Sequence, residues 1–186
     1  TDMGLELNVI CPDHGIIWRK DPGKIVNAYA KWCDQEPEKK VVVVYDTMWH
    51  STETMAEKIS EGIKAEGVKV VPMNLRACHR SDIMTEVMNT KAIVVGSPTL
   101  NNNLYPTVSD FLTYMKGLKP QNKIAAAFGS YGWSGESVKQ INSQLESMKM
   151  EIMDEGLRIQ YVPDATGLEK CYEFGKKVGI AVNQHF

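Results

Sequence analysis

From residue 41 onward, segments with a strand-like pattern and segments with a helix-like pattern alternate five times. This alternation constrains the fold more than any other feature, because it is typical of an α/β protein with a mainly parallel sheet. The predicted strands lie at residues 41–44, 68–73, 92–95, 124–128 and 157–162. Apolar residues three or four apart predict the intervening helices over residues 55–63, 108–115, 138–148 and 168–178, with a shorter one over 81–88.

The predicted strands are of two kinds. Residues 41–44, 92–95 and 124–128 are uninterrupted apolar runs, which are typical of central strands covered by helices on both faces. Residues 68–73 contain a lysine and a proline, and residues 157–162 alternate polar with apolar side chains, so we expect both at the edges. With right-handed crossovers, this predicts a doubly wound, five-stranded parallel sheet of order 2-1-3-4-5 with helices on both faces.

A polar segment at residues 34–40 interrupts the hydrophobic pattern and contains a proline, as linkers do. We therefore divide the chain into residues 1–36, with the start of the linker, and a main domain of residues 37–186. The upstream part contains a turn at Pro12–Gly15 and a helix that we expect Asp21 to cap, with Pro22 at its first position. It is too short to fold independently.

Charge and hydropathy exclude several classes of function. Lysine and arginine total 21 against 23 aspartates and glutamates, a formal net charge of −2, so nucleic acid and anionic membranes are not expected partners. No apolar stretch approaches the roughly 20 residues that cross a bilayer, and the first residues lack the pattern of a signal peptide. We therefore expect a cytoplasmic location.

In a doubly wound sheet, ligands bind beyond the carboxyl ends of the strands, where the winding direction switches. The first loop at this position comprises Asp46, Thr47, Met48, Trp49, His50, Ser51, Thr52 and Glu53, and it runs directly into a helix. Hydroxyls and free amides at a helix N-terminus form an anion site, and without a glycine-rich or lysine motif a terminal phosphate monoester is the expected ligand. The alternative is that Ser51 and Thr52 only cap the helix. We expect Asp46 at the surface, capping the loop.

Two further loops meet the same edge of the predicted sheet. The second runs over Gly96, Ser97, Pro98, Thr99, Leu100, Asn101, Asn102, Asn103, Leu104 and Tyr105, and the third over Gly129, Ser130, Tyr131, Gly132, Trp133, Ser134, Gly135 and Glu136. Polar backbone in one and glycines in the other allow close approach to a flat heterocycle. The aromatic side chains of the three loops favour a stacked planar ligand, although any one of them could instead plug its loop.

These three loops resemble those of the flavodoxin-like FMN domain of flavodiiron proteins, and the resemblance covers residues 41–186. It implies that FMN is the cofactor. His50 stands where that family is expected to have a smaller residue, often glycine. The residues implied to contact FMN are Thr47, Met48, Trp49, His50, Ser51, Thr52, Ser97, Pro98, Thr99, Leu100, Asn101, Asn102, Asn103, Tyr105, Ser130, Tyr131, Gly132, Trp133 and Gly135.

The resemblance extends upstream, where residues 11–19 look like the end of that family's β-lactamase-like diiron domain. His14 matches its last iron-binding histidine, but the other ligands have no counterparts in this sequence. One neutral imidazole cannot hold a catalytic metal alone, so we expect no metal site here and interpret residues 1–36 as the remnant of a truncated domain. The apolar Ile16, Ile17, Trp18, Ile25 and Trp32 are then expected to form an exposed patch or an extra contact between chains.

The resemblance implies a domain that passes electrons from a reduced donor, such as a rubredoxin or a reductase, to the diiron centre of an oxygen or nitric oxide reductase. The intact family is usually a homodimer, and this chain alone is not expected to catalyse the reduction. Two alternatives stay open at this point. One is a flavin-dependent NAD(P)H or quinone oxidoreductase, and the other is a flavin-free, receiver-like interaction module.

Overall fold

The computed structural model describes residue 4 and residues 6–186, which divide into two compact units, one ending at Glu36 and the other running from Pro37 to Phe186. The helices are α1 (Gly23–Cys33), α2 (Ser51–Ala65), α3 (Arg80–Met88), α4 (Pro106–Leu118), α5 (Glu136–Ser147) and α6 (Ala165–Asn183). The strands are β1 (Glu38–Tyr45), β2 (Lys69–Asn74), β3 (Thr90–Gly96), β4 (Thr99–Leu100), β5 (Asn103–Leu104), β6 (Ile124–Tyr131), β7 (Glu151–Ile152) and β8 (Leu157–Gln160).

The unit that ends at Glu36 consists of an irregular segment followed by α1. An antiparallel bridge between Ile10 and Trp18 closes a loop, and no residue of α1 is buried. Ile16 and Ile17 are exposed, as predicted, whereas Trp18, Ile25 and Trp32 are half-buried. The expected cap is wrong: α1 begins at Gly23, one residue later than predicted, and no side chain caps it because the N-cap position is occupied by a proline.

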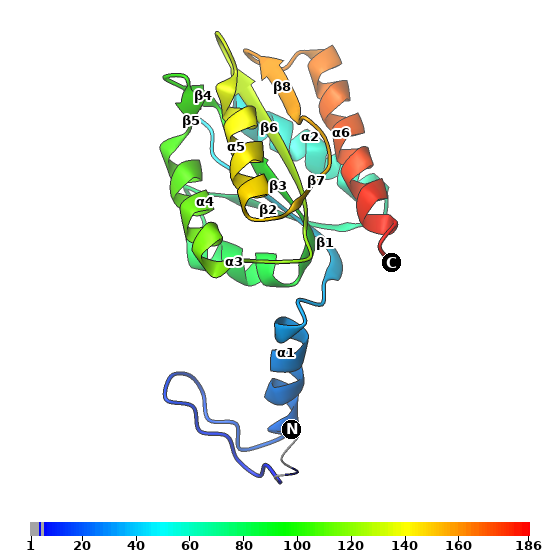
Figure 1. Cartoon of the computed structure of the whole chain (residues 1–186). Helices are drawn as coiled ribbons and strands as arrows, with labels where there is room; N and C mark the ends of the chain where they lie inside the picture. The colour runs from blue at the N-terminus through cyan, green and yellow to red at the C-terminus, as the bar shows by residue number, and fades with distance from the viewer. Residues whose placement is uncertain (1–3, 5) are drawn as a thin grey trace. The chain divides into compact units, whose positions relative to one another are not determined.

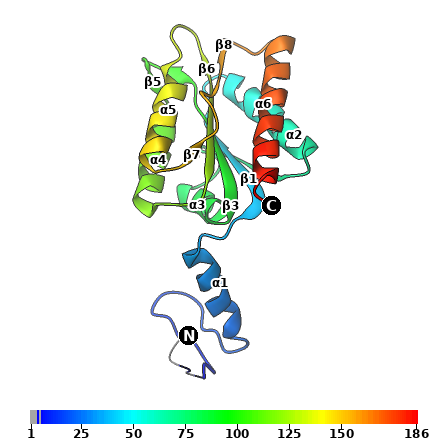
Figure 2. The same ribbon diagram turned by 45° about the vertical axis from the view of Figure 1, so that its right-hand side comes forward.

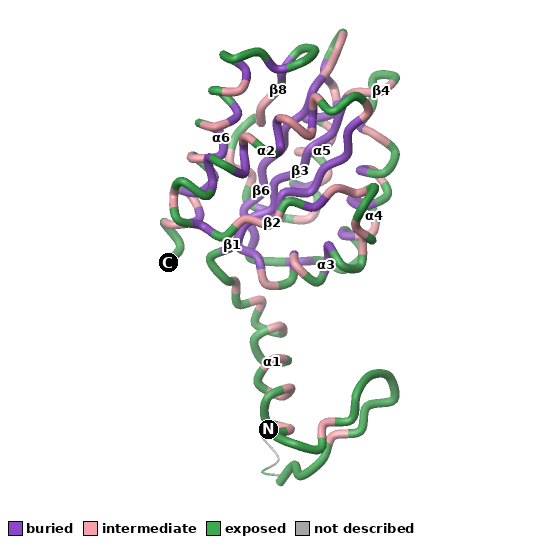
Figure 3. The backbone as a smooth tube through the Cα atoms, turned by 180° about the vertical axis from the view of Figure 1, so that it is seen from behind, coloured by how far each residue is buried: buried purple, intermediate pink, exposed green. Residues whose placement is uncertain are grey.

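The main unit is built on the predicted sheet. Its strand order is β2-β1-β3-β6, followed by β7 and β8, which both pair with β6 in parallel. The order 2-1-3-4-5 is therefore confirmed, as are the two predicted edges. The three central strands carry valine, isoleucine and alanine in uninterrupted runs because helices cover both faces of the sheet, and their described residues are almost all buried (Figure 3).

Two layers of helices enclose the sheet (Figures 1 and 2). α2 and α6 cover one face, where Ile59 and Cys171 pack in a cluster with Val43 of β1. α3, α4 and α5 cover the opposite face, where Phe111 packs in a cluster with Val42. The helices following β1 and β3 therefore lie on opposite faces, which opens the carboxyl edge between these two strands.

Among the described residues, none of the helices combines the length and the apolar character that a membrane span requires.

Two local features differ from the predicted fold. The fifth strand is broken, because residues 153–156 separate β7 from β8, and Gly156 passes so close to Ala127 that a Cβ would lie 2.6 Å from the carbonyl oxygen. The second loop contains a short antiparallel hairpin of β4 and β5, whose turn residues Asn101 and Asn102 both have positive φ. Two consecutive left-handed residues match the twist of a tight hairpin, and asparagine tolerates this conformation well.

Candidate functional site

The three loops converge at the carboxyl edge of β1, β3 and β6, as predicted. A pocket of about 140 Å³ opens there and is lined by Thr47, Met48, Trp49, Ser51, Pro98, Thr99, Ser130, Tyr131, Gly132 and Tyr161. Nine of these ten residues belong to the predicted set. The other predicted residues do not line the pocket; they are His50, Thr52, Ser97, Leu100, Asn101, Asn102, Asn103, Tyr105, Trp133 and Gly135.

The first loop leaves the N-terminus of α2 open. No side chain among the described residues caps this helix, so the amides of its first turn stay available to an anion. The hydroxyl of Thr47 is buried and has no hydrogen-bond partner within the described part of the chain. A buried hydroxyl without a partner is costly, so this oxygen favours a ligand with a hydrogen-bonding group at the pocket wall.

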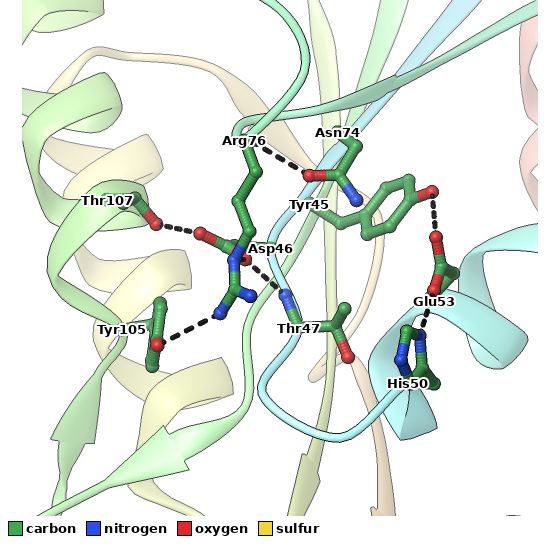
Figure 4. A network of polar contacts seen from close by, with 9 residues as sticks. All are labelled: Tyr45, Asp46, Thr47, His50, Glu53, Asn74, Arg76, Tyr105 and Thr107. Atoms are coloured by element: carbon green, nitrogen blue, oxygen red, sulfur yellow. Dashed lines mark hydrogen bonds and ion pairs between the residues drawn. The ribbon is translucent and has the colours of Figure 1, made fainter.

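His50 precedes α2 in the left-handed conformation, with a φ of 64°. This conformation favours glycine, which explains why a smaller residue is expected at this position. The exposed imidazole does not line the pocket. Its Nδ1 lies 2.6 Å from one carboxylate oxygen of Glu53. The other carboxylate oxygen of Glu53 accepts a hydrogen bond from the Tyr45 hydroxyl (Figure 4). Burial raises the pKa of Tyr45, and the neighbouring Glu53 carboxylate adds to this increase.

Thr52 does not line the pocket, and its contact with a phosphate stays a prediction. It is fully buried, and its hydroxyl lies 2.9 Å from the hydroxyl of Ser130 in the third loop. This contact joins the first and third loops. Ser51, by contrast, lies at the pocket wall and makes none of the hydrogen bonds of a capping residue.

Ser97 organises the second loop from inside. Its buried hydroxyl donates to the carbonyl of Pro98 and accepts a hydrogen bond from the amide of Tyr105 at 2.8 Å. Gln140 of α5 holds the hairpin from outside, because its side chain accepts from the amide of Leu104 and donates to the carbonyl of Asn102. The loop is therefore shaped by the protein alone, with Pro98 and Thr99 left at the pocket.

The third loop depends on close backbone approach. A Cβ at Gly129 would lie 2.3 Å from the carbonyl oxygen of Ser97, so only glycine lets the second and third loops meet this closely. Gly135 has a φ of 75° and immediately precedes α5, with the Tyr131 ring against it. The amide of Tyr161 donates to the carbonyl of Tyr131 at 2.7 Å, which brings Tyr161 to the pocket from beyond β8.

The aromatic residues of the loops differ sharply in exposure. Trp49 is 83% exposed and Trp133 is 92% exposed, values that no packing role explains. Tyr105, which was also expected to flank a planar ligand, lies outside the pocket lining, and its hydroxyl accepts a hydrogen bond from Arg76. Tyr161, at 64% exposure, lines the pocket but was not predicted. Its sequence signal is its position near the carboxyl end of the strand predicted over residues 157–162.

Asp46 is not at the surface, so that expectation is wrong. Its side chain is fully buried, where it accepts hydrogen bonds from the amide of Thr47, from Arg76 and from the hydroxyl of Thr107 (Figure 4). The capping role within the loop holds, through the amide of Thr47. The carboxylate raises the pKa of the Arg76 guanidinium by Coulombic attraction. Three donors, one of them charged, allow this carboxylate to be buried.

Taken together, the pocket fits a phosphorylated planar ligand. The open amides of α2 and the unpaired Thr47 hydroxyl suit a phosphate, and no lysine or arginine belongs to the first loop. The indoles of Trp49 and Trp133 are free to cover an aromatic ring. Within the described residues, no group of three or more histidine, cysteine, aspartate or glutamate side chains could hold a metal ion.

A doubly wound sheet of order 2-1-3-4-5 with an anion site and aromatic side chains at its switch point defines a flavodoxin-like domain. The sequence profile of the family described as flavodoxin matches residues 43–175. The chain therefore belongs to the flavodoxin family, which binds FMN.

Similar proteins include a nitric oxide reductase from Moorella thermoacetica, 42% identical over 97% of this chain and 45% of the relative. A rubredoxin-oxygen oxidoreductase from Megalodesulfovibrio gigas is 41% identical over 96% of this chain and 45% of the relative. The crystal structure of the flavodiiron protein from Giardia intestinalis has a TM-score of 0.93 at 30% identity, covering 98% of this chain and 46% of that one. The resemblance to flavodiiron proteins is confirmed, and the chain spans about half the length of these relatives.

Proposed function

We propose that this chain binds FMN in the pocket between the three loops and passes electrons from a reduced donor to a diiron centre. The observation that supports this most is the buried Thr47 hydroxyl, left without a partner beside the uncapped N-terminus of α2. Family membership supports the choice of FMN among phosphorylated planar ligands.

Each part of the pocket has a role in this proposal. The Thr47 and Ser51 side chains, with amides of residues 48–51, would hold the phosphate. Backbone groups of the second and third loops around Thr99 and residues 130–133 would face the ring. The indoles of Trp49 and Trp133 would shield the ring from water, which accounts for their exposure in the chain alone.

Bound FMN supplies the redox chemistry, which is the gain and loss of single electrons, while the protein supplies position and electrostatics. No basic residue in the first loop neutralises the phosphate. The negative charge retained there would disfavour further negative charge on the ring, because like charges repel more strongly at reduced dielectric. The protein would thereby lower the reduction potential of the flavin.

The partners follow from the same proposal. Relatives are named rubredoxin-oxygen oxidoreductase and flavorubredoxin, which favours a rubredoxin-like donor. We infer that the acceptor is a diiron domain of the longer parent protein, that this parent is a homodimer, and that residues 1–36 are the remnant of that diiron domain. His14 would contribute to iron binding only in the intact protein.

An anaerobic titration of the purified chain tests this function. We expect it to bind one equivalent of FMN that is reduced and reoxidised reversibly, with no turnover of oxygen or nitric oxide by the chain alone. Failure of the purified chain to bind added FMN would contradict the cofactor assignment. Steady-state NAD(P)H oxidation would instead support the flavin-dependent oxidoreductase alternative. Turnover of nitric oxide by iron-free protein would refute the proposal that the chain only passes electrons to a diiron centre.

A further inference from the structure

Arg76 lies in the turn after β2, outside the three loops and outside the pocket lining. Its backbone is held in place, because its amide donates to the side chain of Asn74 at 2.8 Å and the amide of Leu75 donates to the carbonyl of Tyr45 at 2.9 Å. The turn is therefore attached to the end of β1, directly before the first loop. The guanidinium lies between Asp46, at the start of that loop, and Tyr105 (Figure 4).

The guanidinium contacts two loops at once. Its Nε donates to Oδ1 of Asp46 at 2.8 Å, and its Nη2 donates to the hydroxyl of Tyr105, at the end of the second loop, at 3.1 Å. A planar guanidinium presents donors in a fixed arrangement, which a lysine cannot reproduce. One side chain thus sets the spacing between the first and second loops.

The carboxylate of Asp46 transmits this arrangement to the pocket. The oxygen that accepts from Arg76 also accepts from the amide of Thr47 at 2.6 Å, and Thr47 carries the unpaired hydroxyl at the pocket wall. The side chain of Asp46 is 0% exposed, so its charge depends on Arg76 for compensation. Without that compensation, a buried negative charge would lie one residue from the proposed phosphate site.

We propose that Arg76 is a positioning residue for phosphate binding: through Asp46 it orients Thr47, and it cancels the negative charge that would otherwise repel the ligand's phosphate. This inference rests on the proposed function, because it concerns the same FMN pocket. It assigns Arg76 no direct contact with the ligand. Its effect should therefore depend on whether the ligand carries a phosphate.

The test compares FMN with riboflavin, which has the same ring but no phosphate. The full chain without cofactor is titrated with each ligand, and quenching of ring fluorescence gives the two dissociation constants. For Arg76→Met we expect the affinity for FMN to fall about tenfold or more, while the affinity for riboflavin stays within about twofold of wild type. Arg76→Lys keeps the positive charge but loses the planar arrangement of donors. Its affinity for FMN should lie between those of wild type and Arg76→Met.

Arg80→Met is the matched control. Arg80 also pairs with an aspartate 30 residues away in sequence, Asp110, but this pair is exposed and touches none of the three loops. We expect both ligands to bind this variant as they bind wild type. Circular dichroism and urea unfolding show whether each variant is folded. If Arg76→Met does not fold, Arg76→Lys is compared with wild type in its place.

The outcomes are distinct. Selective loss of FMN affinity in Arg76→Met supports the inference, and partial recovery in the double variant Asp46→Asn/Arg76→Met supports the role of charge. Equal loss of both ligands would show that Arg76 only maintains the structure and would overturn the inference, as would unchanged FMN affinity. If wild type binds riboflavin and FMN equally, or neither, the proposed phosphate site itself is refuted, and the role of Arg76 is refuted with it.

Discussion

Single residues decide how much of the pocket is reserved for a ligand. The hydroxyl of Ser97 bonds to Pro98 and Tyr105, and that of Thr52 bonds to Ser130, so both have partners within the protein, and their contact with the cofactor stays a prediction. Thr47 is the exception among these hydroxyl side chains, because its oxygen is buried and lacks a partner among the described residues. The unpaired Thr47 hydroxyl should therefore destabilise the chain without ligand, and a hydrogen bond to the ligand should remove this destabilisation.

This balance predicts opposite effects of Thr47→Val on stability and on binding. The free energy of unfolding without cofactor should stay unchanged or rise by up to about 1 kcal/mol, since an unsatisfied hydroxyl is replaced by a methyl of the same shape. The affinity for FMN should fall about tenfold. Urea unfolding and ligand titration measure the two quantities. In Thr107→Val, whose hydroxyl is bonded to Asp46, stability should instead fall, and equal losses in both variants would contradict the argument.

At the scale of elements, glycines set the distance between α2 and α6. These two helices lie side by side over one face of the sheet (Figure 2). A Cβ at Gly175 of α6 would lie 2.1 Å from the carbonyl oxygen of Ile59, and one at Gly62 of α2 would lie 2.1 Å from the carbonyl of Tyr172. Each glycine thus accommodates the backbone of the other helix, and a side chain there would force the pair apart.

Gly175→Ala should therefore destabilise the protein by about 2 kcal/mol or more, because the clash is with backbone that cannot turn away. Gly117 of α4 provides the matched control, since no atom of the described residues lies within 4 Å of a Cβ built there. Gly117→Ala should raise the free energy of unfolding by about 0.5 kcal/mol through the higher helix propensity of alanine. Urea midpoints compare the two, and a neutral Gly175→Ala would mean that the helices are free to move apart.

At the scale of the whole sheet, lysines line the amino edge, opposite the pocket. Lys40 of β1 pairs in register with Lys69 of β2, and Lys91 and Lys123 immediately precede the paired residues Ala92 and Ile124. Lys40 bonds to Glu86, and Lys123 donates to the carbonyl of Met88 at the C-terminus of α3, where cations are favoured. Burial lowers the pKa of Lys123 to about 8, and the neighbouring Lys91 and Lys40 contribute to the decrease.

This lowered pKa predicts how stability depends on pH. Below about pH 8 the Lys123 amine is protonated in both states, and its burial cost is fully present. Between pH 8 and its ordinary value of 10.5, the unfolded chain holds more protons, so the contribution of Lys123 to unfolding free energy rises with pH. The unfolding free energy of wild type minus that of Lys123→Met should rise across this range in urea unfolding. Lys123→Arg, which stays charged, should lack the rise, and a flat difference would refute the lowered pKa.

The pattern of the sequence alone determined the winding of this protein. Apolar runs marked β1, β3 and β6 as central, and the polar residues at 68–73 and 157–162 marked the edges, because burial on one or two faces leaves its record in each strand. The three loops followed from that order, since ligands bind where the winding switches. The break between β7 and β8 was invisible, because so short a strand has no periodicity to detect.

Only the tertiary structure decided which residues of those loops face the pocket. Thr47, Ser97 and Thr52 look alike in sequence, yet the Thr52 hydroxyl bonds to Ser130 from a distant segment, the Ser97 hydroxyl bonds within its own loop, and the Thr47 hydroxyl has no partner among the described residues. Tyr161 and Arg76 reach the site from outside the three loops, and the burial of Asp46 depends on Arg76 and Thr107 together. Local pattern records burial against a core, whereas a binding site depends on partners that meet only when the chain has folded.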